Sequence, residues 1–241
     1  MSVTILRPRQ RVYTLGDISS VTEQRPAVPA AAGNWWEAGG ATGAVAVYQP
    51  KGATSYAGLT IPPSWSSKQD LSGNGRDAVE VTGPPNWNTA FGWVGAAGCG
   101  GLNVGGGYTT DGGQYSAVVR CAGLPSWQFP FRVAGSTHLA VQTLTVPSAR
   151  FFSGGVVSAS VVTATEGVWG LTSADGSNQA EGYFNGLKVT IDWTTLAPGA
   201  GFTLQCGLTA QLLWSIQAIA WYDGGLTAAQ HLAIATAMAA L

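Results

Sequence analysis

The fold of this chain is decided near its C-terminus, by the stretch Ile219–Gln230 (IAWYDGGLTAAQ). The first part of this stretch closes a long apolar run, Leu212–Tyr222, which is typical of a buried strand. The second part carries a capping box, in which the side chains of Thr227 and Gln230 each bond a backbone N–H of the first helical turn. The Ala-rich sequence that follows favours a helix through Ala240. We expect this weakly amphipathic helix to pack on the rim of a sheet domain.

Short apolar runs separated by turn sequences extend upstream of this stretch. Ala44–Tyr48 is one such run, and the turn residues Gln49–Gly52 end it. The other predicted strands are Ala78–Val81, Ser116–Arg120, His138–Thr145, Val156–Val162, Lys188–Trp193 and Phe202–Cys206. Many short strands at this spacing, without helices alternating between them, predict an all-β sandwich.

Length and composition agree with one large β domain and exclude several classes of protein. The chain has 241 residues, of which 34 are Gly and 12 are Pro, and sandwiches of about 200–250 residues commonly form one domain. Only 10% of the residues are charged and the net charge is −1, which argues against a nucleic-acid partner. No apolar run reaches the roughly 18 residues of a membrane span. The three cysteines, Cys99, Cys121 and Cys206, lack paired spacing and are expected as buried thiols.

Residues 1–33 differ from the rest of the chain and are expected to form an extended arm with a Pro/Ala hinge, Pro26–Gly33. Four arginines and two acidic residues give this arm a net charge of +2. Because it has few apolar anchors, it should not fold alone. It either packs on its own domain or docks on a neighbouring subunit, and residues 34–241 form the sandwich domain. The candidate docking residues are Arg7, Arg9, Arg11 and Tyr13.

Three motifs, in order along the chain, resemble those of concanavalin A-like (laminin-G-like) jelly-roll domains. Asp70–Ala78 (DLSGNGRDA) resembles their D-x-S/T-G-N-G-N-x-A turn, and Tyr183–Val189 (YFNGLKV) is similar to their Y-V-N-G-x-x-V hairpin. Ile219–Gln230 resembles their closing strand and terminal helix. The departures from these motifs, none of which opposes the fold, are Arg76, Gly224, Gly225 and Gln230. The resemblance implies a jelly-roll sandwich with an extended N-terminal arm and a short C-terminal helix.

A further segment, Val47–Ala53 (VYQPKGA), resembles versions of this domain carried by virion proteins of tailed bacteriophages. Together with the arm, this resemblance implies a non-enzymatic virion structural protein, either a head decoration or a tail or fibre component. Such a protein would be made in the host cytoplasm and displayed on the virion surface. It would contact other virion proteins through its arm, as a symmetric homo-oligomer or multi-copy assembly.

The alternative function is a glycan-binding adhesin that attaches the particle to host or environmental carbohydrate. Sugar sites combine exposed aromatic rings with a few polar groups that bind the hydroxyls. The candidate aromatic residues lie in or beside turn-rich segments and are Trp65, Trp87, Trp93 and Trp127. Each of them alternatively packs beneath a loop. Trp193, Trp214 and Trp221 lie within strand runs and are expected in the core.

A remote alternative is a glycan hydrolase, which needs two carboxyl groups flanking one bond, about 5–5.5 Å apart in retaining enzymes. The glutamates are isolated from one another along the sequence, so we assign no catalytic residue. His138 lies in an apolar alternation and His231 on the terminal helix, and both are expected to be structural.

No cofactor is expected, although the resemblance to laminin-G-like domains allows a calcium ion at the loop rim. Calcium takes six to eight oxygen ligands, and the one dense cluster of oxygen-bearing side chains is Asp70, Asn74 and Asp77. The alternative is that these side chains cap the backbone of their own turn.

Overall fold

The structure is a computed structural model of the chain. It describes residues 34–56, 66–96, 98–123, 131–133, 139–143, 148–153, 156–157, 162–163, 166–173, 180–189, 200–201, 203–206 and 215–241. Several residues singled out from the sequence lie outside this part: Arg7, Arg9, Arg11, Tyr13, Trp65, Trp127, His138, Trp193 and Trp214. What the sequence predicts for those residues stays a prediction.

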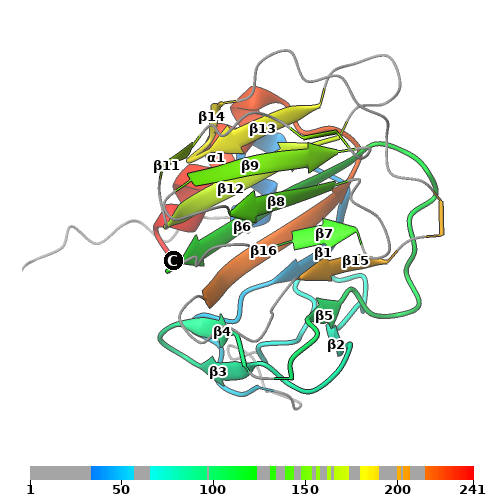
Figure 1. The fold of residues 1–241 in the computed structure, drawn as a ribbon, viewed down its shortest axis with the longest axis vertical. Coiled ribbons are helices and arrows are strands. Elements are labelled where there is room, and N and C mark those ends of the chain that lie inside the picture. The colour runs from blue at the N-terminus through cyan, green and yellow to red at the C-terminus, as the bar shows by residue number, and fades with distance from the viewer. Residues whose placement is uncertain are drawn as a thin grey trace, which may run out of the picture. The chain divides into compact units, whose positions relative to one another are not determined.

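Within the described residues, the strands form two antiparallel sheets of eight strands each (Figure 1). The first sheet has the spatial order β14 (Leu187–Lys188), β13 (Glu181–Phe184), β12 (Gly167–Thr172), β6 (Tyr115–Ala122), β16 (Ser215–Asp223), β4 (Gly92–Val94) and β3 (Asn86–Asn88), and β1 (Ala44–Tyr48) also pairs with β16. The second sheet has the order β10 (Val156–Val157), β9 (Ser148–Ser153), β8 (Leu139–Thr143), β7 (Phe131–Val133), β15 (Leu204–Cys206), β5 (Leu102–Asn103) and β2 (Val79–Glu80), and β11 (Val162–Thr163) pairs with β9. This architecture is the predicted jelly-roll sandwich.

The inner core lies between the two sheets, and β16 shows why the sequence forms it. Successive side chains of a strand point to opposite faces. Ile219 and Trp221 therefore point into the inner core, where the buried Leu204 and Cys206 of the second sheet meet them. The neighbouring strand β6 follows the same alternation along its whole pairing with β16. Trp221 is fully buried, as its place in a strand run predicted.

An outer core covers the opposite face of the first sheet, and the C-terminal helix α1 (Ala228–Ala239) forms it. Ile234 and Met238 of the helix are buried in this core, and the helix contacts β12, β6 and β14 of the sheet. The helix therefore packs on the face of the sheet and not on its rim, which corrects the expectation from the sequence.

The start of α1 confirms the predicted capping box. Gln230 N donates to Thr227 Oγ1 at 3.3 Å, and Thr227 N donates to Gln230 Oε1 at 2.8 Å. A 3₁₀ segment, η2 (Trp35–Gly40), packs along the helix, and its backbone is non-helical at Ala38 and Gly39. No described helix has the length and hydropathy needed to cross a bilayer.

His231 is buried between α1 and the first sheet. Its Nε2 lies 2.9 Å from the hydroxyl of Thr172, and its ring stacks on Tyr183 with the ring centroids 3.8 Å apart. Gly170 lies beneath the ring, where a Cβ atom would come within 2.6 Å of Nδ1. Burial disfavours the charged imidazolium and lowers the pKa of His231 to about 3. These contacts agree with the structural role expected for this residue.

The three cysteines are free and buried, as predicted. Burial raises the pKa of the thiols of Cys121 and Cys206, which lie in the inner core on strands of different sheets. They act as small apolar residues there.

Candidate functional site

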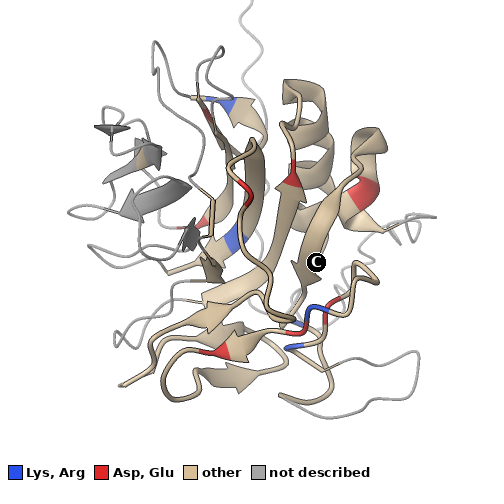
Figure 2. Ribbon diagram, turned by 90° about the vertical axis from the view of Figure 1, so that its right-hand side faces the viewer, with Lys and Arg blue, Asp and Glu red and all other residues tan. Residues whose placement is uncertain are grey.

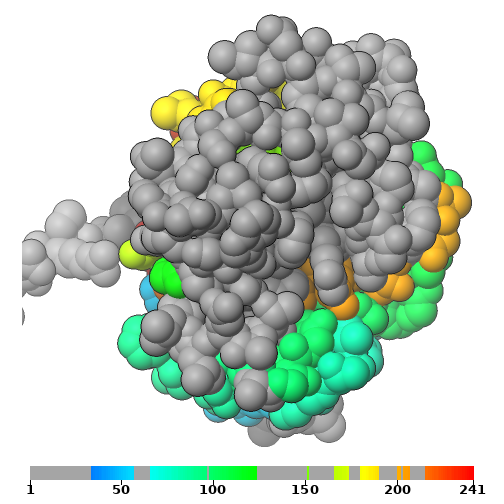
Figure 3. Space-filling model, viewed as in Figure 1, coloured from blue at the N-terminus to red at the C-terminus, as the bar shows by residue number. Residues whose placement is uncertain are grey.

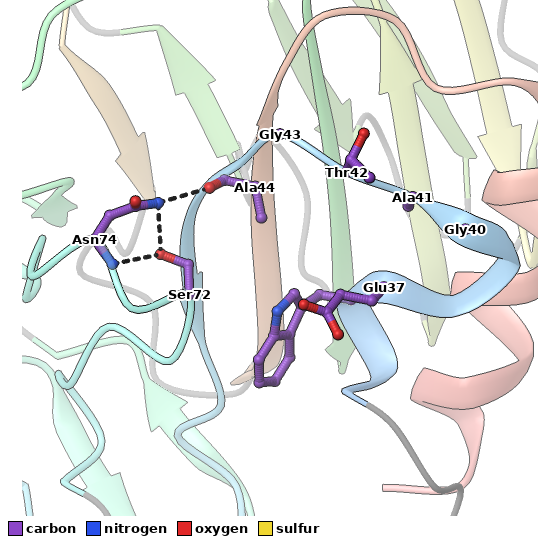
Figure 4. A pocket seen from close by; sticks show the side chains of 9 residues that line it. Glu37, Gly40, Ala41, Thr42, Gly43, Ala44, Ser72 and Asn74 are labelled. Carbon is purple, nitrogen blue, oxygen red and sulfur yellow. Dashed lines mark hydrogen bonds between the residues drawn. The ribbon is translucent and has the colours of Figure 1, made fainter.

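A pocket of about 570 Å³ opens between η2 and the turn formed by Asp70–Asp77 (Figure 4). We call it the Trp36 pocket, and it is lined by Trp36, Glu37, Gly40, Ala41, Thr42, Gly43, Ala44, Ser72 and Asn74. Its volume falls within the range of roughly 300–1,000 Å³ that is common for small-molecule sites. The lining combines an aromatic residue, which is itself largely buried, with a carboxylate, two hydroxyls and an amide.

One wall of the pocket is the glycine-rich segment Gly40–Ala44, which links η2 to β1. Gly43 has a φ of 75°, and a Cβ atom there would lie 3.0 Å from the carbonyl oxygen of Asp223. The Gly43 carbonyl accepts a hydrogen bond from Asp223 N at 2.9 Å, and the Gly40 carbonyl accepts one from Gln230 Nε2 at 3.3 Å. The wall is therefore fixed to the end of β16 and to the start of α1.

The opposite wall is the Asp70–Asp77 turn, and the carboxylate of Asp70 organises it. Asp70 is only 7% exposed. Its Oδ1 accepts hydrogen bonds from Val47 N at 3.0 Å and Ser72 N at 2.9 Å. Its Oδ2 accepts from Ser72 Oγ at 2.8 Å and Arg76 N at 3.0 Å. Asp77 Oδ1 in turn accepts a hydrogen bond from Asp70 N at 2.8 Å. The carboxylates of Asp70 and Asp77 therefore cap the backbone of their own turn.

The hydrogen bonds of the turn engage the side-chain atoms that a calcium ion would need as ligands. Both oxygens of Asp70 already accept two hydrogen bonds each, and the amide nitrogen of Asn74, which is no metal ligand, points at main-chain carbonyls. Calcium needs several oxygens directed at one point. Among the described residues there is also no group of three or more His, Cys, Asp and Glu side chains placed to hold a metal. The contacts fit the turn-capping alternative and do not fit a calcium site.

The two walls are joined through Asn74. Its Nδ2 donates to the carbonyl of Ala44 at 2.8 Å and lies 3.2 Å from that of Val45 (Figure 4). Arg76 adds a second link, because its Nη1 donates to the Val45 carbonyl at 2.7 Å. The guanidinium of Arg76 lies 4.5 Å from the ring centroid of Tyr108, which holds it in a cation–π contact.

Trp36 lines the pocket and is 8% exposed. Its ring packs edge-to-face on Trp35, with the centroids 5.4 Å apart, and its carbonyl accepts a hydrogen bond from Tyr222 Oη at 2.8 Å. Burial raises the pKa of Tyr222, and the negative charge of Glu37 raises it further. Trp36 is thus anchored on the outer core, directly over β16.

Three polar side chains of the lining keep hydrogen-bonding capacity. Glu37 is exposed, and its Oε2 accepts one hydrogen bond, from Asn34 Nδ2 at 3.1 Å. Thr42 is exposed and makes no hydrogen bond to another described residue. Asn74 uses its amide nitrogen in the turn, and no described residue donates to its Oδ1. The lining thus carries a carboxylate, a hydroxyl and an amide oxygen with hydrogen-bonding capacity left.

The tryptophans predicted to form a sugar platform are placed differently. Trp93 on β4 is 0% exposed and donates from Nε1 to Ser67 Oγ at 3.0 Å, so it belongs to the inner core and offers no face to a ligand. This corrects the expectation of an exposed ring. Trp87, opposite it on β3, is half-buried and donates to the Pro50 carbonyl at 2.9 Å. The β3–β4 hairpin lies at the lower border of the face shown in Figure 3.

The sequence pointed to only part of the pocket. Asn74 was singled out, but as a metal ligand, and Trp36 and Glu37 were missed. The signal that could have found them is the dipeptide Trp35–Trp36, which stands before Glu37 and the turn residues Gly39 and Gly40, directly after the hinge of the arm.

Two described glutamates outside the turn, Glu80 and Glu181, are each paired with a lysine. Glu80 pairs with Lys68 at 3.1 Å and accepts from Tyr56 Oη at 2.7 Å. Glu181 pairs with Lys188 at 2.6 Å. These contacts lower the pKa of Glu80, and the contacts of Glu181 with Lys188 and Tyr183 lower its pKa against the opposing effect of burial. Both carboxylates are therefore held ionised.

No protein-family model matches this sequence, and no curated protein sequence matches it. Solved structures share its fold. Domain 4 of AbnA, a GH43 extracellular arabinanase from Geobacillus stearothermophilus determined in complex with arabinotriose, is 13% identical with a TM-score of 0.53, over 80% of this chain and 98% of that domain. Trypanosoma rangeli sialidase in complex with sialic acid is 13% identical with a TM-score of 0.55, over 81% of this chain and 33% of the sialidase.

The receptor-binding domain of botulinum neurotoxin C/D mosaic serotype is 11% identical with a TM-score of 0.55, over 80% of this chain and 51% of that domain. The chain therefore spans nearly all of the arabinanase domain, about half of the toxin domain and about a third of the sialidase. At these identities the likeness shows the fold, a jelly-roll sandwich.

Proposed function

We propose that residues 34–241 form a non-enzymatic carbohydrate-binding domain and that the Trp36 pocket is its glycan site. The observation that carries this proposal is the composition of the pocket. Glu37, Thr42 and Asn74 line the pocket together with Trp36, and the side chains of Asn74 and Arg76 tie the turn to Ala44 and Val45 by hydrogen bonds. Such preorganisation reduces the ordering cost of binding.

Three solved structures that share this fold support the proposal of a carbohydrate-binding domain. One is a domain whose complex holds arabinotriose, and another is a sialidase whose complex holds sialic acid. A third is botulinum neurotoxin type C, whose cell entry depends upon interaction with two ganglioside molecules. The non-enzymatic part rests on Glu80 and Glu181, each of which is paired with a lysine and not with a second carboxylate.

A glycan array probed with the full chain tests the proposal. We expect specific binding to a subset of glycans, and we expect the double variant Glu37→Ala, Thr42→Ala to lose it, because both side chains are exposed in the pocket. Glu166→Ala is the matched control, since Glu166 is an exposed glutamate outside the lining. A blank array for a folded protein, or equal loss in the control, would refute the assignment.

We also propose that the domain is displayed on the surface of a bacteriophage particle and docked there by residues 1–33. The support comes from the sequence, namely the virion-like segment Val47–Ala53 and the basic arm with its hinge. Deleting residues 1–33 should abolish incorporation into particles while circular dichroism shows a folded domain. Unchanged incorporation of the deletion variant would exclude docking through the arm.

A further inference from the structure

We infer that the Trp36 pocket selects neutral or amino-bearing glycans and rejects acidic ones, such as those ending in sialic or uronic acids. This inference rests on the proposed glycan site and narrows the class of its ligand. It follows from the charge of the pocket and from the kind of hydrogen-bonding atoms that the lining leaves open.

Glu37 is the only ionisable side chain among the nine residues that line the pocket. The local charge is therefore −1. Lys, Arg, Asp and Glu residues are sparse along the described part of the ribbon (Figure 2). The negative charge of Glu37 also acts on Tyr222 of β16, where it raises the pKa of the hydroxyl in addition to the effect of burial.

Recognition of a carboxylate sugar is favoured by a cation, ideally an arginine that binds both oxygens. Arg76 stands in the turn that forms the second wall, but it does not line the pocket. Its Nη1 is bound to the Val45 carbonyl at 2.7 Å and its guanidinium lies against the ring of Tyr108. Turning it into the pocket would break both contacts, so it is a structural part of the wall.

The open hydrogen-bonding atoms also favour one kind of ligand. The carboxylate of Glu37 and the Oδ1 of Asn74 can only accept, and the Thr42 hydroxyl can both accept and donate. These side chains therefore favour a ligand that brings donors. Sugar hydroxyls do so, and an ammonium group does so with a favourable charge. A sugar carboxylate brings only acceptors and a like charge.

The test compares three groups of probes on one array with the full chain: neutral oligosaccharides, glucosamine oligomers with free amino groups, and sialylated or uronic-acid-containing oligosaccharides. Hits are then titrated by calorimetry at low and at physiological salt. Because Glu37 is exposed, screening is strong, and we expect acidic glycans to bind about fivefold to tenfold more weakly than their neutral counterparts. Free amino groups should strengthen binding, and more so at low salt.

The variant Glu37→Gln keeps the shape of the side chain and removes its charge. It should bring the acidic and amino-bearing probes to within about twofold of their neutral counterparts, whereas Glu166→Gln should leave the preference unchanged. Glycan binding without discrimination by charge, or discrimination that survives Glu37→Gln, would overturn this inference and leave the glycan site standing. A folded protein that binds none of the three groups would overturn the glycan site itself.

Discussion

The side chain of Asn74 donates a hydrogen bond of 2.8 Å to the carbonyl of Ala44, thirty residues earlier in the chain. This bond joins the Asp70–Asp77 turn to the entrance of β1, and both partners line the Trp36 pocket. The bond therefore couples the shape of the pocket to the Asp70–Asp77 turn, which the sequence had suggested as a calcium site. The predictions below test that coupling and the cores that support it.

Replacing Asn74 should weaken both the turn and the ligand site. Asn74→Ala removes the donor to Ala44 and the open Oδ1, and we expect a loss of about 1–2 kcal/mol in the free energy of unfolding together with weaker glycan binding. Asn74→Asp restores an oxygen but cannot donate to the carbonyls, so it should be at least as destabilising. Urea denaturation and calorimetric titration check this. A variant with unchanged stability and binding would show that the bond contributes nothing.

Asp70 should be necessary for folding of the turn, and calcium should not. Asp70→Ala leaves the donors of Val47, Ser72 and Arg76 without their acceptor, at an expected cost of about 3 kcal/mol or more. The midpoint of thermal unfolding of the unmodified chain should be the same in calcium and in chelator. A saturable rise of the midpoint with calcium that disappears in Asp70→Ala would contradict the structural account of this turn.

Trp93 should matter for stability and not for ligand contact. Trp93→Phe loses the hydrogen bond to Ser67 and part of the buried volume, and we expect a loss of about 1–3 kcal/mol with glycan affinity unchanged. Trp87→Phe, at the half-buried partner position, should cost less. Denaturation curves and titrations of both variants check the order. Lost glycan binding at full stability in Trp93→Phe would restore the idea of an aromatic platform there.

Stability should fall in mild acid because of His231. Its pKa is about 6.5 in the unfolded chain and about 3 in the folded one, so only the unfolded state takes up its proton between these values. The contribution is fully present above pH 6.5 and declines by about 1.4 kcal/mol per pH unit below it. His231→Phe keeps an aromatic ring stacked on Tyr183 and should remove this decline. His138 is present in both proteins, so its contribution cancels when the two pH profiles are compared. Parallel pH profiles for the two proteins would contradict the burial of a neutral imidazole.

The secondary structure that could be predicted is the part with a local chemical signal. Ala44–Tyr48 was predicted with its observed bounds because an apolar run ends there at a proline–glycine turn. The helix start was predicted because a capping box needs only Thr227 and Gln230. The position of the helix was not predicted, because its contacts with β12, β6 and β14 join segments that meet only in the fold.

Most of the Trp36 pocket could not be predicted from the sequence, because its two walls come from segments that meet only in the fold. Asn74 and Ala44 have no sequence pattern in common, and Trp36 stands in a short 3₁₀ segment without periodicity. The prediction for Trp93 was wrong, because its local sequence indicated an exposed position and the fold buries it. Its neighbours are turn residues, but the hairpin of β3 and β4 pairs with β16 and turns that ring into the inner core.

The central claim is that glycans bind in the Trp36 pocket, and nuclear magnetic resonance of the full chain tests it most directly. The isotope-labelled protein is titrated with the strongest hit from the array. The account predicts saturable shifts at the amides of Glu37, Thr42 and Asn74 and at the indole of Trp36, while the β3–β4 hairpin stays unchanged. Shifts centred on Trp87 and its hairpin, with the pocket unaffected, would contradict it.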